Sequence, residues 1–230
     1  KRFKEATAAF QKADAAQPNA ALLSYRLARV ALAQDQPAMA REKLQPYLEK
    51  QLTDEGLEPY ELLAEVLQAL GRTSELVPKL EALHKADPRN VPLGYFLAER
   101  NHQARQWDQA KPLLHALIQR APAAVGYRSL VEIYRSQQQS ELLLDVLGQM
   151  VERTSTLETL GTEAVKALTG DTATVQALLA TARKRAQSAA EPLALGPSLA
   201  MALLAQETKQ AAVSAEFFER AIQAKPDRAA

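Results

Sequence analysis

Apolar residues recur along the chain at i, i+3, i+4 and i+7, and a short polar segment follows each such stretch. The pattern is clearest over residues 91–122. There a first apolar stripe contains Tyr95, Leu97 and Ala98, residues 103–106 are polar, and a second stripe contains Leu114 and Ile118. This spacing is typical of amphipathic helices, so the segment predicts two helices folded back on each other. Neither helix could bury its stripe alone, so the pair needs similar pairs on either side.

The same pattern divides the chain into about six helix pairs. We assign a half unit to 1–19, full units to 21–56, 57–90, 91–123 and 124–153, a degenerate unit to 154–191, and a final unit to 192–230. The degenerate unit lacks the aromatic residues of the others. Because the chain begins with the second half of a unit, we expect a single repeat array that is a piece of a longer protein.

Several positions carry local expectations. Asp35 is expected to be the N-cap of a second helix, with Pro37 in its first turn. Pro46 falls in the same helix and predicts a kink or an early end. Gly71 stands where the end of a first helix favours positive φ. In the last unit Phe218 is expected to face inward.

The repeated marks resemble those of the tetratricopeptide repeat (TPR) family. Small residues stand at Ala28, Ala64, Ala98 and Ala202 in first helices and at Ala6, Ala40 and Ala110 in second helices, large inward residues at Phe10, Leu44, Leu80, Leu114 and Phe218, and closing prolines at Pro18, Pro88, Pro122 and Pro226. Their order, and a period near 34 residues, match the signature of that family. The resemblance implies an all-α, right-handed superhelical solenoid of antiparallel helix pairs. The aromatic residue early in the first helix survives only at Tyr60 and Tyr127.

Composition excludes several classes of function. Lys plus Arg (28) nearly equals Asp plus Glu (27), and both signs are interspersed, so no basic face for nucleic acid emerges. There is no Cys, which excludes disulfides, thiolate metal sites and thiol catalysis. The apolar runs are shorter than the ~20 residues of a membrane helix, and no signal peptide is visible. We expect a soluble protein, either cytoplasmic or periplasmic.

No catalytic constellation is visible. The chain has no phosphate-binding Gly loop, no Gly-x-Ser-x-Gly elbow and no carboxylate pair with an evident cleft. His84, His102 and His115 lack the spacing of a metal site, and His84 and His115 are expected to be ordinary surface residues on second helices. We therefore expect a non-enzyme without metal or cofactor.

The resemblance implies that first helices line a concave groove, which receives a peptide or helical segment of a partner protein. Projected onto this sequence, the groove contains Tyr25, Arg26, Arg29, Glu61, Glu65, Tyr95, Glu99, His102, Arg128 and Arg135. Tyr and Arg are frequent in binding hot spots, which favours Tyr25, Arg29, Tyr95 and Arg128. The alternative is that these charges form a solvated face. The Lys and Asn clamp of carboxylate-binding repeats is not seen, since Tyr25 and Arg29 occupy its places.

Three other functions stay open at this point. The chain could be a structural spacer in a larger envelope or secretion assembly. It could self-associate through uncapped ends, where Phe3, Phe10 and the final helix carry apolar stripes. It could also be a regulatory region of an enzyme whose catalytic domain lies elsewhere.

Overall fold

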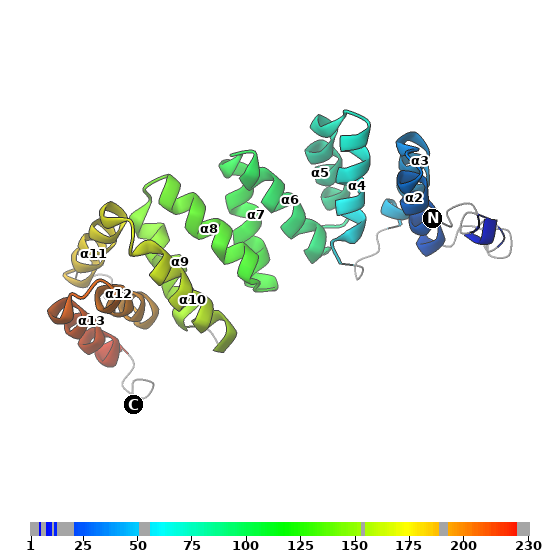
Figure 1. Ribbon diagram of the computed structural model, residues 1–230. Helices are drawn as coiled ribbons and strands as arrows, with labels where there is room; N and C mark the ends of the chain where they lie inside the picture. The colour runs from blue at the N-terminus through cyan, green and yellow to red at the C-terminus, as the bar shows by residue number, and fades with distance from the viewer. Residues whose placement is uncertain are drawn as a thin grey trace. The chain divides into compact units, whose positions relative to one another are not determined.

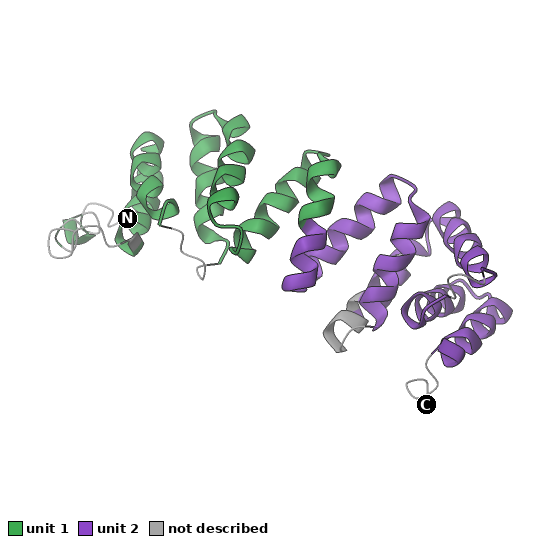
Figure 2. Cartoon of the chain, turned by 180° about the vertical axis from the view of Figure 1, so that it is seen from behind, with its two compact units in different colours: residues 1–113 green, residues 114–230 purple. Residues whose placement is uncertain are grey.

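The computed structural model describes residues 5, 8–10, 12, 21–50, 56–152, 155–188 and 193–224, and every regular element within these ranges is a helix (Figure 1). The prediction of an all-α helical repeat is thus confirmed. The chain forms two compact units, 1–113 and 114–230 (Figure 2), and the division falls within α7 (Trp107–Arg120). Most of the half unit predicted at 1–19 lies outside the described residues.

Unit 1, residues 1–113, contains successive pairs of antiparallel helices. They are α2 (Ala21–Ala33) with α3 (Pro37–Leu48), α4 (Glu58–Ala69) with α5 (Leu76–Ala86), and α6 (Val91–Gln103) with the first half of α7. Ala28 of α2 and Ala40 of α3 are both fully buried, as are Leu44, Val66 and Leu80. Small residues at the first two positions let the α2 and α3 backbones approach closely, and the larger ones fill the space between pairs.

The turns inside five of the described helix pairs, all except α10–α11, share one backbone geometry. The central residue of each turn has positive φ at Asp35, Gly71, Arg105, Gln138 and Lys209, with values between 55° and 69°. The next residue donates its N–H to a carbonyl of the first helix, as from Gln36 to Ala31 (3.0 Å) and from Gln106 to Asn101 (2.8 Å). This is the Schellman arrangement, which satisfies carbonyls left open at a helix C-terminus. The repeat is therefore visible in the backbone even where the sequence has no glycine.

The turn geometry tests the expectations for Gly71 and Asp35. The positive φ at Gly71 is confirmed. The assignment of Asp35 as an N-cap was wrong, because Asp35 terminates α2 and the N-cap of α3 is Gln36, which makes no side-chain capping bond. Pro37 lies in the first turn of α3 as expected, and α3 passes through Pro46 before it ends at Leu48.

Unit 2, residues 114–230, is built around two helices that bury most of their residues. It contains the second half of α7 and α8 (Ala124–Ser136), α9 (Ser140–Glu152), α10 (Ser155–Leu168), α11 (Thr172–Ala186), α12 (Leu195–Glu207) and α13 (Ala211–Ala224). Helix α9 packs against α8, α10, α11 and α12. Its buried residues include Leu143, Leu144, Val146, Leu147 and Met150. Its polar residues Glu141, Asp145 and Gln149 are spaced four apart, so α9 keeps one polar stripe and buries the broad apolar face opposite.

Helices α9 and α12 meet at two glycines. A Cβ atom added to Gly148 would lie 2.5 Å from Pro197, and one added to Gly196 would lie 2.4 Å from the Gly148 carbonyl oxygen. Only glycine permits this approach. The last pair therefore packs directly on α9, although the α10–α11 pair intervenes in the sequence. In this unit the packing departs from the simple scheme in which each repeat contacts only its neighbours.

The last helix, α13, buries a different face from the one predicted. Phe217 is fully buried and Ala221 is 1% exposed, whereas Phe218 is 36% exposed and Ile222 is 49% exposed. The inward placement of Phe218 was therefore wrong by one position. Consecutive Phe residues gave no period by which to choose between them.

Candidate partner-binding surface

Helix α2, the first helix of its pair, presents an aromatic residue with a cation stacked on it. Tyr25 is half-buried on α2, and its ring centroid lies 5.1 Å from that of Tyr47 on α3. The Arg29 guanidinium carbon lies 5.9 Å from the Tyr25 ring centroid, within cation–π range. Arg26 is exposed on the same helix. Tyr47 was not anticipated as part of this arrangement, yet its buried ring is what fixes the position of Tyr25.

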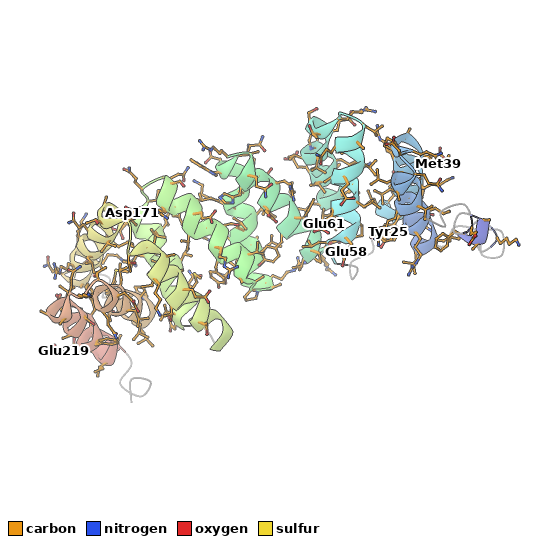
Figure 3. All side chains as sticks on the ribbon, in the orientation of Figure 1. Tyr25, Met39, Glu58, Glu61, Asp171 and Glu219 are labelled. Atoms are coloured by element: carbon orange, nitrogen blue, oxygen red, sulfur yellow. The ribbon has the colours of Figure 1, made fainter. Side chains whose placement is uncertain are left out.

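Helix α4, the first helix of the following pair, presents carboxylates. Glu61 (Figure 3) and Glu65 are exposed, while Leu62, Leu63 and Val66 are buried. Their spacing of four residues places both carboxylates on one face. Helices α2 and α4 are in contact, yet within the described part of the chain none of Arg26, Arg29, Glu61 and Glu65 forms an ion pair.

Helix α6 offers less surface than the sequence suggested. Tyr95 is only 7% exposed, so its side chain belongs mainly to the packing of α6. Glu99 and His102 are partly exposed, and Glu99 Oε1 accepts a hydrogen bond from Gln103 Nε2 at 3.1 Å. Because Tyr95 is buried, replacing it would disturb the fold as well as any contact with a partner.

In unit 2 the two predicted arginines pair with later helices. Arg128 on α8 lies 3.8 Å from Glu163 on α10, and both side chains are more than half exposed. Arg135 lies 3.0 Å from Asp171, the N-cap of α11. Among the described residues, the charges predicted on α2 and α4 thus form no ion pair, whereas the two arginines predicted in unit 2 do. The partners Glu163 and Asp171 stand about one repeat after their arginines, which is a signal the sequence contains.

Asp171 is the most strongly bonded carboxylate of this set. It accepts from Thr174 Oγ1 at 2.8 Å, from the Thr174 backbone N–H at 3.1 Å and from Arg135 Nε at 3.0 Å. The Thr174 hydroxyl is the largest cause that lowers the pKa of Asp171, followed by the Thr174 N–H and then Arg135. Each of these donors favours the ionised form.

His115 is not the ordinary surface residue that was expected. Its Nε2 lies 2.5 Å from the Tyr134 hydroxyl, which links α7 to α8 within unit 2. Burial lowers the pKa of His115 and raises the pKa of Tyr134. A neutral imidazole hydrogen-bonded to a neutral phenol is consistent with both directions, and the pair holds two helices together.

Metal-holding clusters and membrane-spanning helices are both absent from the described residues. In this part of the chain no group of three or more His, Cys, Asp or Glu side chains is placed to hold a metal ion. None of the described helices combines the length and the apolarity needed to cross a bilayer.

Comparisons with known proteins support the fold. The chain is similar to the crystal structure of the C-terminal part of a TPR repeat-containing protein from Cytophaga hutchinsonii, with a TM-score of 0.50 and 14% sequence identity over 97% of this chain and 91% of that chain. No protein-family model matches the sequence, and no curated protein matches it. The likeness therefore extends to the helical repeat architecture.

Proposed function

We propose that the protein is a non-catalytic scaffold that binds an extended or helical segment of a partner protein. The binding surface is the first-helix face of unit 1, which is formed by α2 and α4, the first helices of their pairs. The observation that carries this proposal is the set of unpaired charges beside a fixed aromatic ring. Arg26 and Arg29 are on α2, Glu61 and Glu65 are on α4, and Tyr25 is held by Tyr47.

The chemistry of this surface suggests what the segment should contain. A ring that is held in place loses little conformational entropy on binding, and Arg and Tyr are the residue types most often found as anchors. Adjacent cationic and anionic helices favour a ligand with the opposite order of charges. We therefore expect a segment with acidic residues toward α2 and basic residues toward α4.

Selection from a random peptide library displayed on phage tests this proposal. Enriched peptides should carry acidic and basic residues in a fixed order, with micromolar affinity of about −8 kcal/mol. The double reversal Arg26→Glu with Arg29→Glu should weaken them at least about tenfold, or about 1.4 kcal/mol. A library that yields no charged consensus would contradict the proposal.

The carboxylates allow a matched control. Glu61→Ala with Glu65→Ala should weaken binding of the selected peptides, whereas Glu42→Ala with Glu81→Ala should not. Glu42 and Glu81 are also exposed, but they lie on the second helices α3 and α5. Equal effects of the two double variants would show that general charge, and not the first-helix face, governs binding.

A second candidate function is self-association through α13. The exposed apolar side chains of Phe218 and Ile222 support it, because large apolar residues four apart on one helix face are suited to packing against another helix. Sedimentation equilibrium should then show a dimer that dissociates in the Phe218→Glu, Ile222→Glu variant. A monomer at all concentrations would exclude this function.

A further inference from the structure

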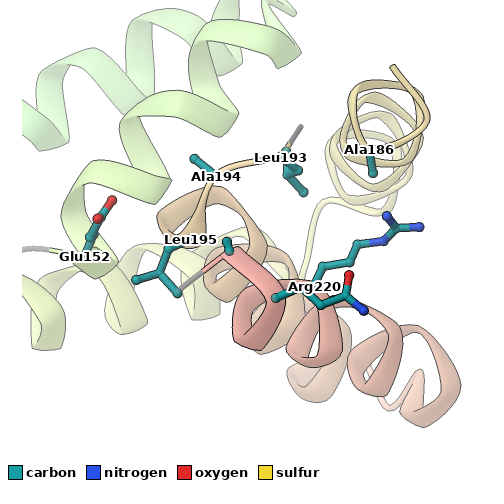
Figure 4. A pocket seen from close by; sticks show the side chains of 8 residues that line it. Glu152, Ala186, Leu193, Ala194, Leu195 and Arg220 are labelled. Carbon is teal, nitrogen blue, oxygen red and sulfur yellow. The ribbon is translucent and has the colours of Figure 1, made fainter. Parts of the chain in front are cut away.

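A pocket in unit 2 lies among the end of α11, the start of α12 and the second half of α13 (Figure 4). Its volume is about 570 Å³, within the range of small-molecule sites. The pocket is lined by Glu152, Ala186, Leu193, Ala194, Leu195, Arg220, Gln223 and Ala224, of which five are Ala or Leu. A ligand that fits should have a mainly apolar body.

Arg220 provides a positive charge that is incompletely neutralised. Its Nη2 lies 3.3 Å from Glu216 Oε1, but its Nε is buried and has no hydrogen-bond acceptor within the described residues. The other oxygen of Glu216 lies 3.5 Å from Arg183 Nη2, so two guanidinium groups share one carboxylate. A buried donor without an acceptor is unfavourable, and a second carboxylate is its natural complement.

The other acidic group of the pocket stands apart from Arg220. Figure 4 shows Glu152 on the far side of Leu195. Glu152 Oε2 lies 3.0 Å from the point that a Cβ of Gly196 would occupy, which places it beside the first turn of α12. The pocket thus has a cationic side at Arg220 and an apolar wall of Leu193 and Leu195.

We propose that this pocket binds a carboxylate carried on a short unbranched acyl chain, with the carboxylate at Arg220 and the chain against Leu193 and Leu195. A peptide terminus would also need partners for its amide groups, and among the described lining residues Gln223 alone has an uncharged polar side chain. The site is separate from the surface proposed for protein binding, because all its residues belong to unit 2. Either proposal can therefore fail without the other.

Calorimetric titration of the whole chain with octanoate tests the proposal. We expect saturable binding of one octanoate, and at least about tenfold weaker binding of octanamide, which has the same chain without the charge. Arg220→Gln should weaken octanoate to the level of octanamide. The matched control is Arg183→Gln, which removes the other guanidinium on Glu216 but does not line the pocket.

A second variant tests whether the pocket volume itself is needed, independently of the Arg220 charge. Ala224→Leu adds apolar volume at an exposed helical position in the lining and keeps Arg220. It should abolish octanoate binding while the circular dichroism spectrum stays unchanged. Equal binding of octanoate and octanamide, equal effects of Arg220→Gln and Arg183→Gln, or the absence of saturable binding would each overturn the proposal. Tighter binding of the tripeptide acetyl-Ala-Leu-Leu than of octanoate would overturn it in favour of a peptide terminus.

Discussion

Arg135 Nε on α8 lies 3.0 Å from Asp171 Oδ2, while the same carboxylate caps the first turn of α11. The Asp171 side chain therefore caps the N-terminus of α11 in its own repeat and also contacts the preceding repeat. The two residues are 36 positions apart, close to the repeat length. A cap whose second function is an ion pair with α8 couples the local stability of α11 to that interhelical contact.

Asp171→Ala should lower the urea midpoint of unfolding more than Arg135→Ala does. The first change removes the cap and the ion pair, whereas the second removes only an exposed ion pair, which contributes little. Equilibrium urea unfolding followed by circular dichroism measures both. Asp171→Asn is the informative control, because asparagine can cap the helix without the charge. It should resemble Arg135→Ala, and a loss as large as that of Asp171→Ala would show that the charge is dominant.

The contribution of Asp171 should disappear in acid. Its pKa is lower in the folded chain than in the unfolded chain, where it is near 3.9. The unfolded state therefore binds the proton more readily, so the stabilisation is present above the unfolded pKa and is lost as pH falls through the folded pKa. The difference in urea midpoint between wild type and Asp171→Asn should be constant from pH 7 to about 5 and shrink below about 4. A constant difference down to pH 2 would contradict this.

His115 should make the fold sensitive to mild acid in the same direction. Burial lowers its pKa below the unfolded value near 6.5, so the unfolded chain takes up the proton first as pH falls. Stability should thus be lost as pH decreases through about 6.5, and His115→Gln should show a smaller loss over that interval. NMR titration of the His115 ring reports the folded pKa directly. A folded pKa above 6.5 would mean that Tyr134 favours the charged imidazole instead.

The α9–α12 contact predicts opposite outcomes for two glycines. Gly148→Ala should cost about 1–3 kcal/mol, because its Cβ would meet the Pro197 ring at 2.5 Å in a packed interface. Gly170→Ala is the matched control, since no atom lies within 4 Å of the position of its Cβ. It should be neutral or stabilising by up to about 1 kcal/mol. Equal effects in thermal unfolding would show that α9 and α12 do not approach as closely as described.

Much of this fold follows from the sequence, and the exceptions have identifiable causes. The helix pairs and the burial of Ala28 and Ala40 follow from a 3.6-residue period that tertiary packing preserves. The direct packing of α12 on α9 does not follow from the sequence, because α12 is apolar all round and its pattern shows no preferred face. The turn at Asp35 was misread because an acidic residue before a helix resembles an N-cap, and positive φ leaves no mark unless glycine is present.

The candidate surface could likewise be predicted from the sequence only in part. The pattern placed Arg26, Arg29, Glu61 and Glu65 on exposed helix faces, where they lie. It could not distinguish these from Tyr95, because an aromatic residue on a first helix can point to either side of a pair. The spacing of about one repeat is compatible with the Arg128–Glu163 and Arg135–Asp171 pairs, but whether such pairs form depends on the separation of the helices.

The adjacent phenylalanines of α13 give the sharpest test of which face it buries. Phe217 is fully buried, so Phe217→Ala should cost about 3–5 kcal/mol through lost packing and a residual cavity. Phe218 is 36% exposed, and Phe218→Ala should change the stability of the monomer by no more than about 0.5 kcal/mol. The two variants have the same composition and differ only in the face of the helix they alter. Urea unfolding at a protein concentration low enough to keep the chain monomeric measures both, and a larger loss from Phe218→Ala would mean that α13 is rotated relative to its described position.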